Sequence, residues 1–270
     1  MGGDVFRDEH SMYFDGTDDS IHFQSNIAGT FNETAATSSG HTDPTVYWNT
    51  VTCWVKMQGT DPNTQRLWQV EGSNCGWIFV DNGSNWDLGY NTGNGDRLGI
   101  RDAQANWTGK WNHCVMSWEV NAGMSADTVL DDSTAGLMLP LIWINGVQQT
   151  VTYSGGTTNS NDVNNNDQSK FAIASNSTDG GDNSQDLNAW VSDVAIYKRK
   201  FDGAMVKTVY NGREPFNHND WGIGANYCTL WCRFGDTAGD TATVLKDASN
   251  FGNGSTETAD GAPYLTGDTP

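Results

Sequence analysis

Cysteine, proline, glutamate and basic residues are all scarce in this chain of 270 residues. Its 5 cysteines are an odd number, and in a chain this long they do not suggest a disulfide framework. Cys228 and Cys232 are four residues apart, which in a strand separates their Cα atoms by about 13 Å, whereas a disulfide needs about 4.4–6.8 Å. Cys53 and Cys114 lie in strand-like apolar runs. We therefore expect buried free thiols and synthesis in a reducing compartment.

Long apolar runs and positive charge are also lacking. No stretch approaches the roughly 18 apolar residues that a membrane-spanning helix needs, and residues 1–7 lack the basic start and apolar core of a signal peptide. The chain has 14 basic and 33 acidic residues, so its net charge is −19. A surface this negative repels nucleic acid and anionic membranes, and we expect neither as a partner.

The acidic residues are mostly aspartate, because only 6 of the 33 are glutamate. Aspartate favours turns and loop ends, whereas glutamate favours helices. Together with 31 glycines and 12 tryptophans, this composition indicates many short strands joined by turns. It favours an all-β fold.

Alternating apolar residues predict a series of strands with Gly, Asn and Asp between them. One segment changes period: Phe201, Met205, Val206 and Val209 recur at helical spacing after a capping aspartate, which predicts one short helix near 202–211. Two low-complexity segments, 121–136 and 154–169, are expected to be exposed loops. The strands are expected at 11–14, 20–23, 46–57, 66–70, 76–81, 86–90, 97–101, 111–120, 137–144, 147–153, 171–174 and 190–197.

Several motifs occur in the order typical of one fold family. They are Met12-Tyr-Phe-Asp-Gly-Thr-Asp-Asp-Ser-Ile, Val51-Thr-Cys-Trp-Val-Lys, Gly109-Lys-Trp-Asn-His-Cys-Val, Leu141-Ile-Trp-Ile-Asn-Gly-Val, and Ser192 to Tyr197 followed by Val209-Tyr-Asn-Gly. Over residues 12–212 the sequence resembles laminin-G-like, concanavalin-A-type jelly rolls. The resemblance implies an all-β sandwich of two antiparallel sheets.

The ends of the chain depart from the family pattern. A segment similar to the usual opening strand and loop lies near the C-terminus, at 230–236 and 247–254, so we predict a circularly permuted jelly roll. Residues 12–266 are expected to form a single such domain, with 214–226 connecting to the C-terminal strand segment 227–266 and with residues 1–11 as an N-terminal arm. The other interpretation is the start of a second, truncated repeat.

Nothing in the sequence indicates catalysis. Glycoside hydrolases on this fold use Glu-x-Asp-x-x-Glu to place two carboxyl groups together, and that motif is missing. The 5 histidines show no zinc-ligand spacing, and neither a phosphate loop nor a nucleophile elbow is present. We expect the protein not to be an enzyme.

A calcium ion is the one cofactor that the resemblance implies. Jelly rolls of this type often hold Ca²⁺ at the rim, which suggests Asp193 as a ligand with Asp15 and Gly16 as partners; oxygen-only ligation suits this ion. The alternative is that Asp193 only hydrogen-bonds turn amides. Residues 162–173 begin like an EF-hand loop but lack its glycine and its final glutamate, so we read them as a solvated loop.

Tryptophans suggest sugar binding because aromatic faces can stack on sugar rings. Most of them lie in expected strands, where large aromatics build cores. Trp86, Trp107 and Trp221, near turn-forming residues, are the candidates for exposed carbohydrate-binding side chains.

Laminin-G-like jelly rolls with an end like residues 230–236 resemble domains of tailed-phage virion proteins. This resemblance implies a non-enzymatic virion structural protein, such as a phage capsid decoration or appendage protein. It would be synthesised in the host cytoplasm, lie on the virion surface, and contact other virion proteins or a host surface glycan. The alternative is an extracellular carbohydrate-binding lectin module. Formation of a homo-oligomer is left open.

Overall fold

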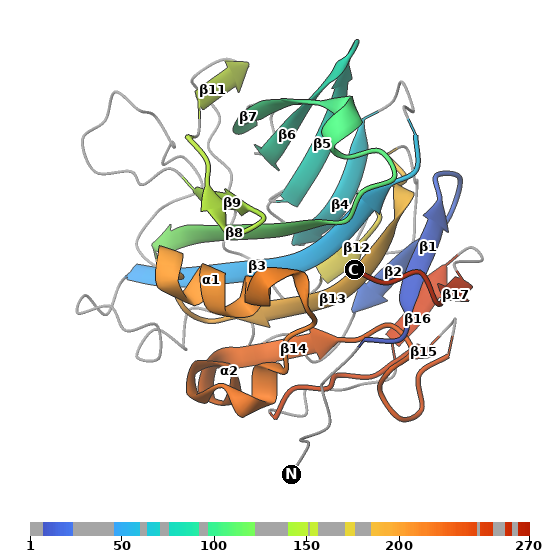
Figure 1. Cartoon of the computed structure of the whole chain (residues 1–270), viewed down its shortest axis with the longest axis vertical. Coiled ribbons are helices and arrows are strands. Elements are labelled where there is room, and N and C mark those ends of the chain that lie inside the picture. Colours follow the sequence, from blue (N-terminus) through green and yellow to red (C-terminus); the bar gives the residue numbers. More distant parts are fainter. Residues whose placement is uncertain are drawn as a thin grey trace.

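Two antiparallel β-sheets pack face to face in the computed structural model (Figure 1). The structure describes residues 8–23, 46–59, 64–70, 76–91, 97–121, 140–150, 152–155, 171–175, 185–241, 244–250, 257–260 and 264–270. The expectation of a two-sheet jelly-roll sandwich is confirmed. The arm residues 1–7, most of the two low-complexity segments and the EF-hand-like stretch up to residue 170 lie outside the described residues.

The first sheet has eight strands in the order β10-β9-β8-β3-β13-β1-β17, with β14 paired to β13 beside β1. Its longest pairing joins β3 to β8, from Val46 opposite Asn121 to Val55 opposite Asn112. The strands are β1 (Ser11–Asp15), β3 (Val46–Met57), β8 (Asn112–Asn121), β9 (Leu141–Ile144), β10 (Val147–Gln148), β13 (Asn188–Tyr197), β14 (Cys228–Cys232) and β17 (Tyr264–Thr266).

The second sheet has nine strands in the order β11-β7-β6-β5-β4-β12-β2-β16-β15. They are β2 (Ser20–Phe23), β4 (Gln65–Val70), β5 (Gly76–Asn82), β6 (Asn85–Asn91), β7 (Arg97–Ala103), β11 (Thr152–Gly155), β12 (Phe171–Ile173), β15 (Val244–Leu245) and β16 (Glu257–Asp260). Two expected strands differ from those observed. The strand expected at 137–144 is described only from Leu141, and the one expected at 147–153 is divided into β10 and β11.

The main core lies between the two sheets because strand residues alternate between faces. In β3, Val51, Cys53 and Val55 point into this core, while Trp54 points to the other side and stacks on Tyr210. A second apolar cluster covers the outer face of the first sheet, where Val115, Trp143, Ala195, Tyr197 and Trp231 pack against helical segments. The first sheet is thus covered on both sides.

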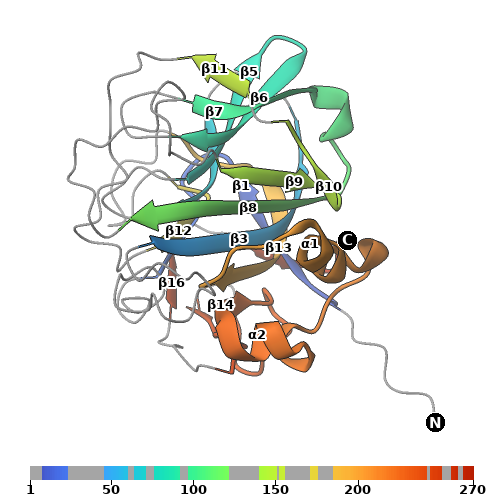
Figure 2. The same ribbon diagram turned by 90° about the vertical axis from the view of Figure 1, so that its left-hand side faces the viewer.

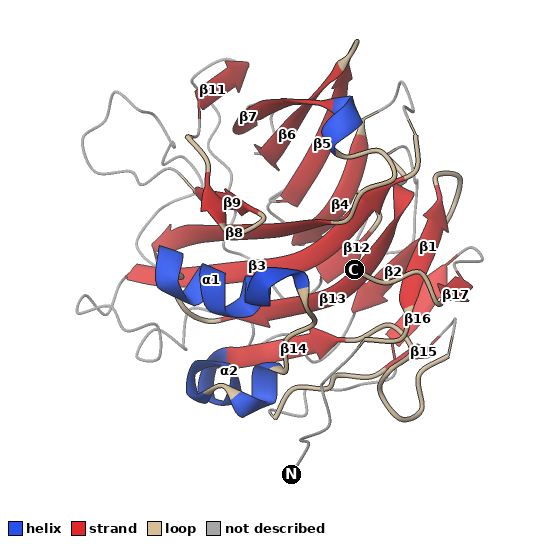
Figure 3. Cartoon of the chain, viewed as in Figure 1, coloured by secondary structure: helices blue, strands red, loops and turns tan. Residues whose placement is uncertain are grey.

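The helices gather on that outer face (Figures 2 and 3). They are α1 (Gly203–Tyr210) and α2 (Gly222–Tyr227), with the 3-10 turns η4 (Asn211–Arg213) and η5 (His218–Asp220). A further 3-10 turn, η3 (Gln104–Asn106), lies beside the β5–β6 turn, where the Gln104 amide donates to the Ser84 carbonyl at 3.0 Å. The predicted helix is α1: the Asp202 carboxylate accepts hydrogen bonds from the Ala204 and Met205 amides, and Asn211 ends the helix in a left-handed conformation. Helix α2 was not predicted. Of the two helices in the described residues, neither is long and apolar enough to cross a bilayer.

The C-terminal segment is built into both sheets. β14 pairs with residues 194–197 of β13, β16 pairs with β2, and β17 pairs with β1. Leu230, Cys232 and Phe234 are buried in the main core, so this segment contributes strands to both sheets and side chains to the core between them. The expected arm boundary is wrong for residues 8–11, because Asp8 is buried and Ser11 begins β1.

Candidate functional site

A groove opens on the outer face of the first sheet, between the end of α1 and η5. Its volume is about 620 Å³. We call it the Trp221 groove. Its lining includes Asn211, Glu214, Phe216, Asn217, Asp220 and Trp221.

Local hydrogen bonds fix the backbone of the Trp221 groove. After α1 the chain turns sharply at Asn211, whose side-chain amide donates to the Pro215 carbonyl at 3.2 Å. Asn217 then begins η5: its Oδ1 accepts from the Asn219 amide at 3.1 Å, and its Nδ2 donates to Asp220 Oδ2 at 2.9 Å. Because these contacts are short-range, the walls of the groove are held in place without a ligand.

Two aromatic rings give the Trp221 groove an apolar wall. Trp221 is partly exposed, and its ring lies edge-on to Phe216 at 5.9 Å and 78°. On its inner side the indole packs against Tyr197 at 6.2 Å and Phe201 at 5.8 Å, both fully buried. Trp221 is therefore a rigid ring supported by the second apolar cluster and accessible from the groove.

The rim of the Trp221 groove is polar. Asn211, Glu214 and Asp220 are exposed, and they offer amide donors and carboxylate acceptors beside the aromatic wall. Concave sites of this kind, an apolar surface with a few oriented polar groups, bind small molecules whose hydroxyls can both donate and accept.

Of the three predicted tryptophans, only Trp221 lies in this groove. Trp86 and Trp107 are fully buried, so the expectation that they are exposed is wrong. Both rings lie edge-on to Phe79 in the main core, at 5.9 Å and 5.2 Å, and the Trp107 indole donates to Asp102 Oδ2 at 2.9 Å. Their Gly, Asn and Asp neighbours form turns, but the indoles themselves point inward.

The predicted calcium ligands do not form one site. Asp15 is opposite Asn188, five residues from Asp193 along β13, a spacing of about 16 Å in a strand. Asp193 has a φ of 52° at a bulge between the parts of β13 that pair with β1 and β14. Its carboxylate is buried and accepts hydrogen bonds from Trp231 Nε1 at 2.5 Å and from His218 Nε2 at 3.3 Å.

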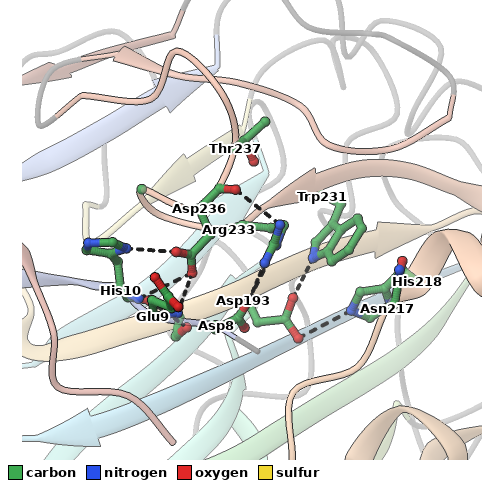
Figure 4. A network of polar contacts seen from close by, with 12 residues as sticks. Asp8, Glu9, His10, Asp193, Asn217, His218, Trp231, Arg233, Asp236 and Thr237 are labelled. Atoms are coloured by element: carbon green, nitrogen blue, oxygen red, sulfur yellow. Dashed lines mark hydrogen bonds and ion pairs between the residues drawn. The ribbon is translucent and has the colours of Figure 1, made fainter. Parts of the chain in front are cut away.

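In the described residues, the hydrogen-bond partners of Asp193 are therefore side chains of the 214–226 connection and of β14, and not turn amides. With the proton on His218 Nε2, Nδ1 of this ring accepts from the Tyr197 hydroxyl. Figure 4 shows Asp193 between Trp231 and His218. The arrangement satisfies the buried carboxylate and holds η5, which forms one wall of the Trp221 groove, against the sheet.

Asp15 does lie in an acidic cluster, at the turn between β1 and β2. Carboxylate oxygens of Asp15, Asp18 and Asp19 lie within 4.8 Å of one another, and Gly16 is in the same turn with a φ of 82°. Asp19 Oδ2 accepts a hydrogen bond from the Asp15 amide at 2.9 Å. The donor set is oxygen-only, as calcium prefers.

A second polar group, which we call the terminal clamp, consists of Asp8, His10, Arg233 and Asp236 (Figure 4). Arg233 Nη2 lies 3.2 Å from Asp8 Oδ1, and Nη1 of the same guanidinium donates to the Asp236 carbonyl at 3.1 Å. The Asp236 carboxylate contacts His10 Nδ1 at 2.7 Å. Burial raises the pKa of Asp8 to about 8; Asp193 and Asp236 add to the rise, and Arg233 opposes it. No candidate site residue predicted from the sequence belongs to this clamp.

No protein-family model matches the sequence, and no curated protein matches it. Solved structures do. A candidate carbohydrate-binding protein from Bacteroides ovatus has 12% identity and a TM-score of 0.56; the match covers 97% of this chain and 60% of that protein. The fold is a lectin-like jelly roll. At this identity the likeness concerns the fold alone, and this chain spans only 60% of the other protein's length.

Two further matches have lower TM-scores. A heptameric SAP-like pentraxin from Limulus polyphemus shows 16% identity over 78% of this chain and 87% of that one, with a TM-score of 0.45. A sialidase from Trypanosoma rangeli shows 15% identity over 75% of this chain and 27% of that one, with a TM-score of 0.44. Neither TM-score reaches 0.5.

Proposed function

We propose that this protein binds carbohydrate in the Trp221 groove and acts as a lectin-like binding module, not as an enzyme. The observation that carries the proposal is the partly exposed Trp221 ring, backed by buried aromatics and bordered by exposed amide and carboxylate groups. A sugar ring has one apolar C–H face and equatorial hydroxyls, which match such a wall and rim.

The aromatic wall supplies affinity. Trp221 is already immobilised by Tyr197 and Phe201, so binding costs little further side-chain entropy. Loss of such a ring face is expected to weaken binding at least about tenfold, which is about 1.4 kcal/mol.

The rim supplies orientation. Asn217 is held by its bonds to the Asn219 amide and to Asp220, while Asn211 is held by its bond to the Pro215 carbonyl. Polar groups held in this way can select among sugars by the positions of their hydroxyls, because a missing partner leaves a desolvated group unpaired. We expect discrimination between epimers.

Binding should be measured by isothermal titration calorimetry, after a glycan array has identified the best neutral oligosaccharide. Trp221→Ala is expected to abolish binding and Trp221→Phe to retain part of it. Glu214→Gln, at an exposed position, tests the rim with little effect on folding. Trp190→Ala is the matched control, since Trp190 is a partly exposed tryptophan on β13 outside the groove.

The proposal fails if no neutral glycan binds to the wild-type protein. It also fails if Trp221→Ala and Trp190→Ala lower affinity equally, because a loss common to both would reflect the fold and not the groove. Thermal unfolding of each variant shows whether the protein is still folded at the titration temperature.

A virion role is a separate proposal, which concerns the location of the binding module. Glycan recognition is compatible with a location on a virion surface, with host glycans as ligands, or with an extracellular location. The Trp221 groove favours the lectin alternative over a purely structural role. Copurification with assembled particles at a fixed stoichiometry would support the virion location.

A further inference from the structure

A second groove of about 560 Å³ lies between η3, β8, the β9–β10 turn and η4. We call it the Arg213 groove. Its lining includes Asn106, Lys110, Trp111, Asn112, Asn145 and Arg213. It differs from the Trp221 groove in charge.

Two cationic side chains line the Arg213 groove in a protein whose net charge is −19. Lys110 and Arg213 both line it and are exposed. The acidic side chain in the lining is Asp102, whose oxygens already accept hydrogen bonds from the Ala103 amide, Asn106 Nδ2 and Trp107 Nε1 at 2.8–2.9 Å. These donors are neutral, so Asp102 keeps its charge. Lys110, whose Nζ also donates to the Ala105 carbonyl at 2.7 Å, and Arg213 outnumber it among the lining side chains, and the excess positive charge favours an anion.

The backbone at Arg213 has a positive φ, which glycine adopts freely and arginine adopts only with strain. Asn211, Gly212 and Arg213 have φ values of 46°, 66° and 84°. An arginine pays a conformational penalty at such a position, where glycine would be relaxed. The conformation places its side chain at the groove, where Nε donates to the Tyr210 hydroxyl at 3.1 Å. Backbone strain combined with a cationic side chain at a concave surface favours a binding role.

The rest of the Arg213 groove is amide-rich and aromatic. Asn145 Nδ2 donates to Asn112 Oδ1 at 2.8 Å, and Asn145 Oδ1 accepts from the His113 amide at 3.0 Å, so these amides are fixed. Trp111 is partly exposed, and Lys56 Nζ lies 5.3 Å from its ring centroid. A carboxylate alone would not need an aromatic side chain or oriented amides, whereas an acidic sugar uses both.

We propose that the Arg213 groove binds an acidic saccharide, with the sugar carboxylate at Lys110 and Arg213 and the ring against Trp111. Arginine is suited to the carboxylate because its planar fork can donate two hydrogen bonds. This site is separate from the Trp221 groove, although η4 lines both: Asn211 lines the first groove and Arg213 the second.

The probes are sialyllactose and trigalacturonate, with lactose as the neutral reference, each titrated by calorimetry and by NMR. Arg213→Gly is expected to lower affinity for the bound acidic probe at least tenfold without lowering the melting temperature, because glycine relieves the backbone strain. Lys110→Gln should also weaken binding. Lys207→Gln removes one exposed lysine outside both grooves and should leave the affinity unchanged.

The proposal is overturned if neither acidic probe binds, or if lactose binds as tightly as both. It is also overturned if Lys207→Gln weakens binding as much as Lys110→Gln, since the effect would then follow net charge alone. If Arg213→Gly does not fold, Lys110→Gln still decides. Trp221→Ala distinguishes the two proposals, because it should abolish neutral-glycan binding and leave the acidic probe bound.

Discussion

Replacing Asp8 by asparagine should make the protein more stable at alkaline pH. Asp8 is 5% exposed, and burial together with Asp193 and Asp236 raises the pKa of its carboxyl group from 3.8 to about 8, against the effect of Arg233. In the unfolded chain the same group loses its proton near pH 4. Between about pH 4 and pH 8 the folded state therefore binds more protons than the unfolded state, and stability falls as pH rises through this window.

The size of the effect follows from the shift. A raised carboxyl pKa contributes its full stabilisation below about pH 4, and each pH unit of the window removes about 1.4 kcal/mol. From pH 5.5 to pH 8 the wild type should lose about 3 kcal/mol through this group. The asparagine side chain of the variant cannot titrate, and its carbonyl can still accept from Arg233. The stability difference between Asp8→Asn and wild type should therefore shift in favour of the variant by about this amount.

Urea unfolding at several pH values between 5.5 and 8.5, at constant ionic strength, measures this difference. Asp87→Asn is the control, because Asp87 pairs with the exposed Arg101 on the surface; such pairs contribute at most about 1 kcal/mol, with little pH dependence in this range. The reasoning is refuted if the difference is the same at every pH. It is also refuted if Asp8→Asn becomes less stable as pH rises, which would mean that the ion pair with Arg233 dominates.

Three further predictions concern other parts of the molecule. Gly224→Ala should destabilise the protein by roughly 3 kcal/mol or more in urea unfolding, because a Cβ at this position would lie 1.8 Å from the His218 carbonyl oxygen. Gly222→Ala should leave stability unchanged, because a Cβ there would have no atom within 4 Å. Equal effects of the two substitutions would contradict the clash. We propose that the β1–β2 turn binds calcium, so calorimetry should detect Ca²⁺ binding that Asp18→Asn abolishes, and a wild type without such binding would exclude the site. The four thiols that are buried in the described part of the chain should not react with Ellman's reagent until the protein unfolds, and their rapid reaction in the native protein would disprove their burial; they are Cys53, Cys114, Cys228 and Cys232.

The strands were predictable because their signal is local. Alternation and turn residues located β3 at its observed bounds and β8 to within one residue. Helix α2 was missed because its sequence, Gly-Ile-Gly-Ala-Asn-Tyr, contains two residues of low helix propensity. Tertiary packing explains the glycine at 224, which allows the helix to approach the His218 carbonyl.

The site was only partly predictable, since burial and long-range contacts decide it. Turn neighbours predicted exposed indoles at three positions, of which Trp221 is partly exposed whereas Trp86 and Trp107 are buried, because whether an indole points inward depends on the opposite sheet. The family resemblance indicated Asp193 as a calcium ligand, but its hydrogen-bond donors, His218 and Trp231, are 25 and 38 residues away in the sequence. No local pattern predicts such a pairing. The Arg213 groove likewise assembles residues from distant segments, and its clearest local signal is a cation after Asn211-Gly212.

The bulge at Asp193 divides one edge of β13 between strands from opposite parts of the chain. β1 pairs with residues 188–191 and β14 with residues 194–197, so each half of the edge is covered only while its own segment stays in place. Release of β14 would expose a short row of unpaired amides and carbonyls, which can recruit the same strand from another molecule. Reciprocal exchange between two copies would preserve every native pairing, so a domain-swapped dimer would be held by the same contacts as the monomer.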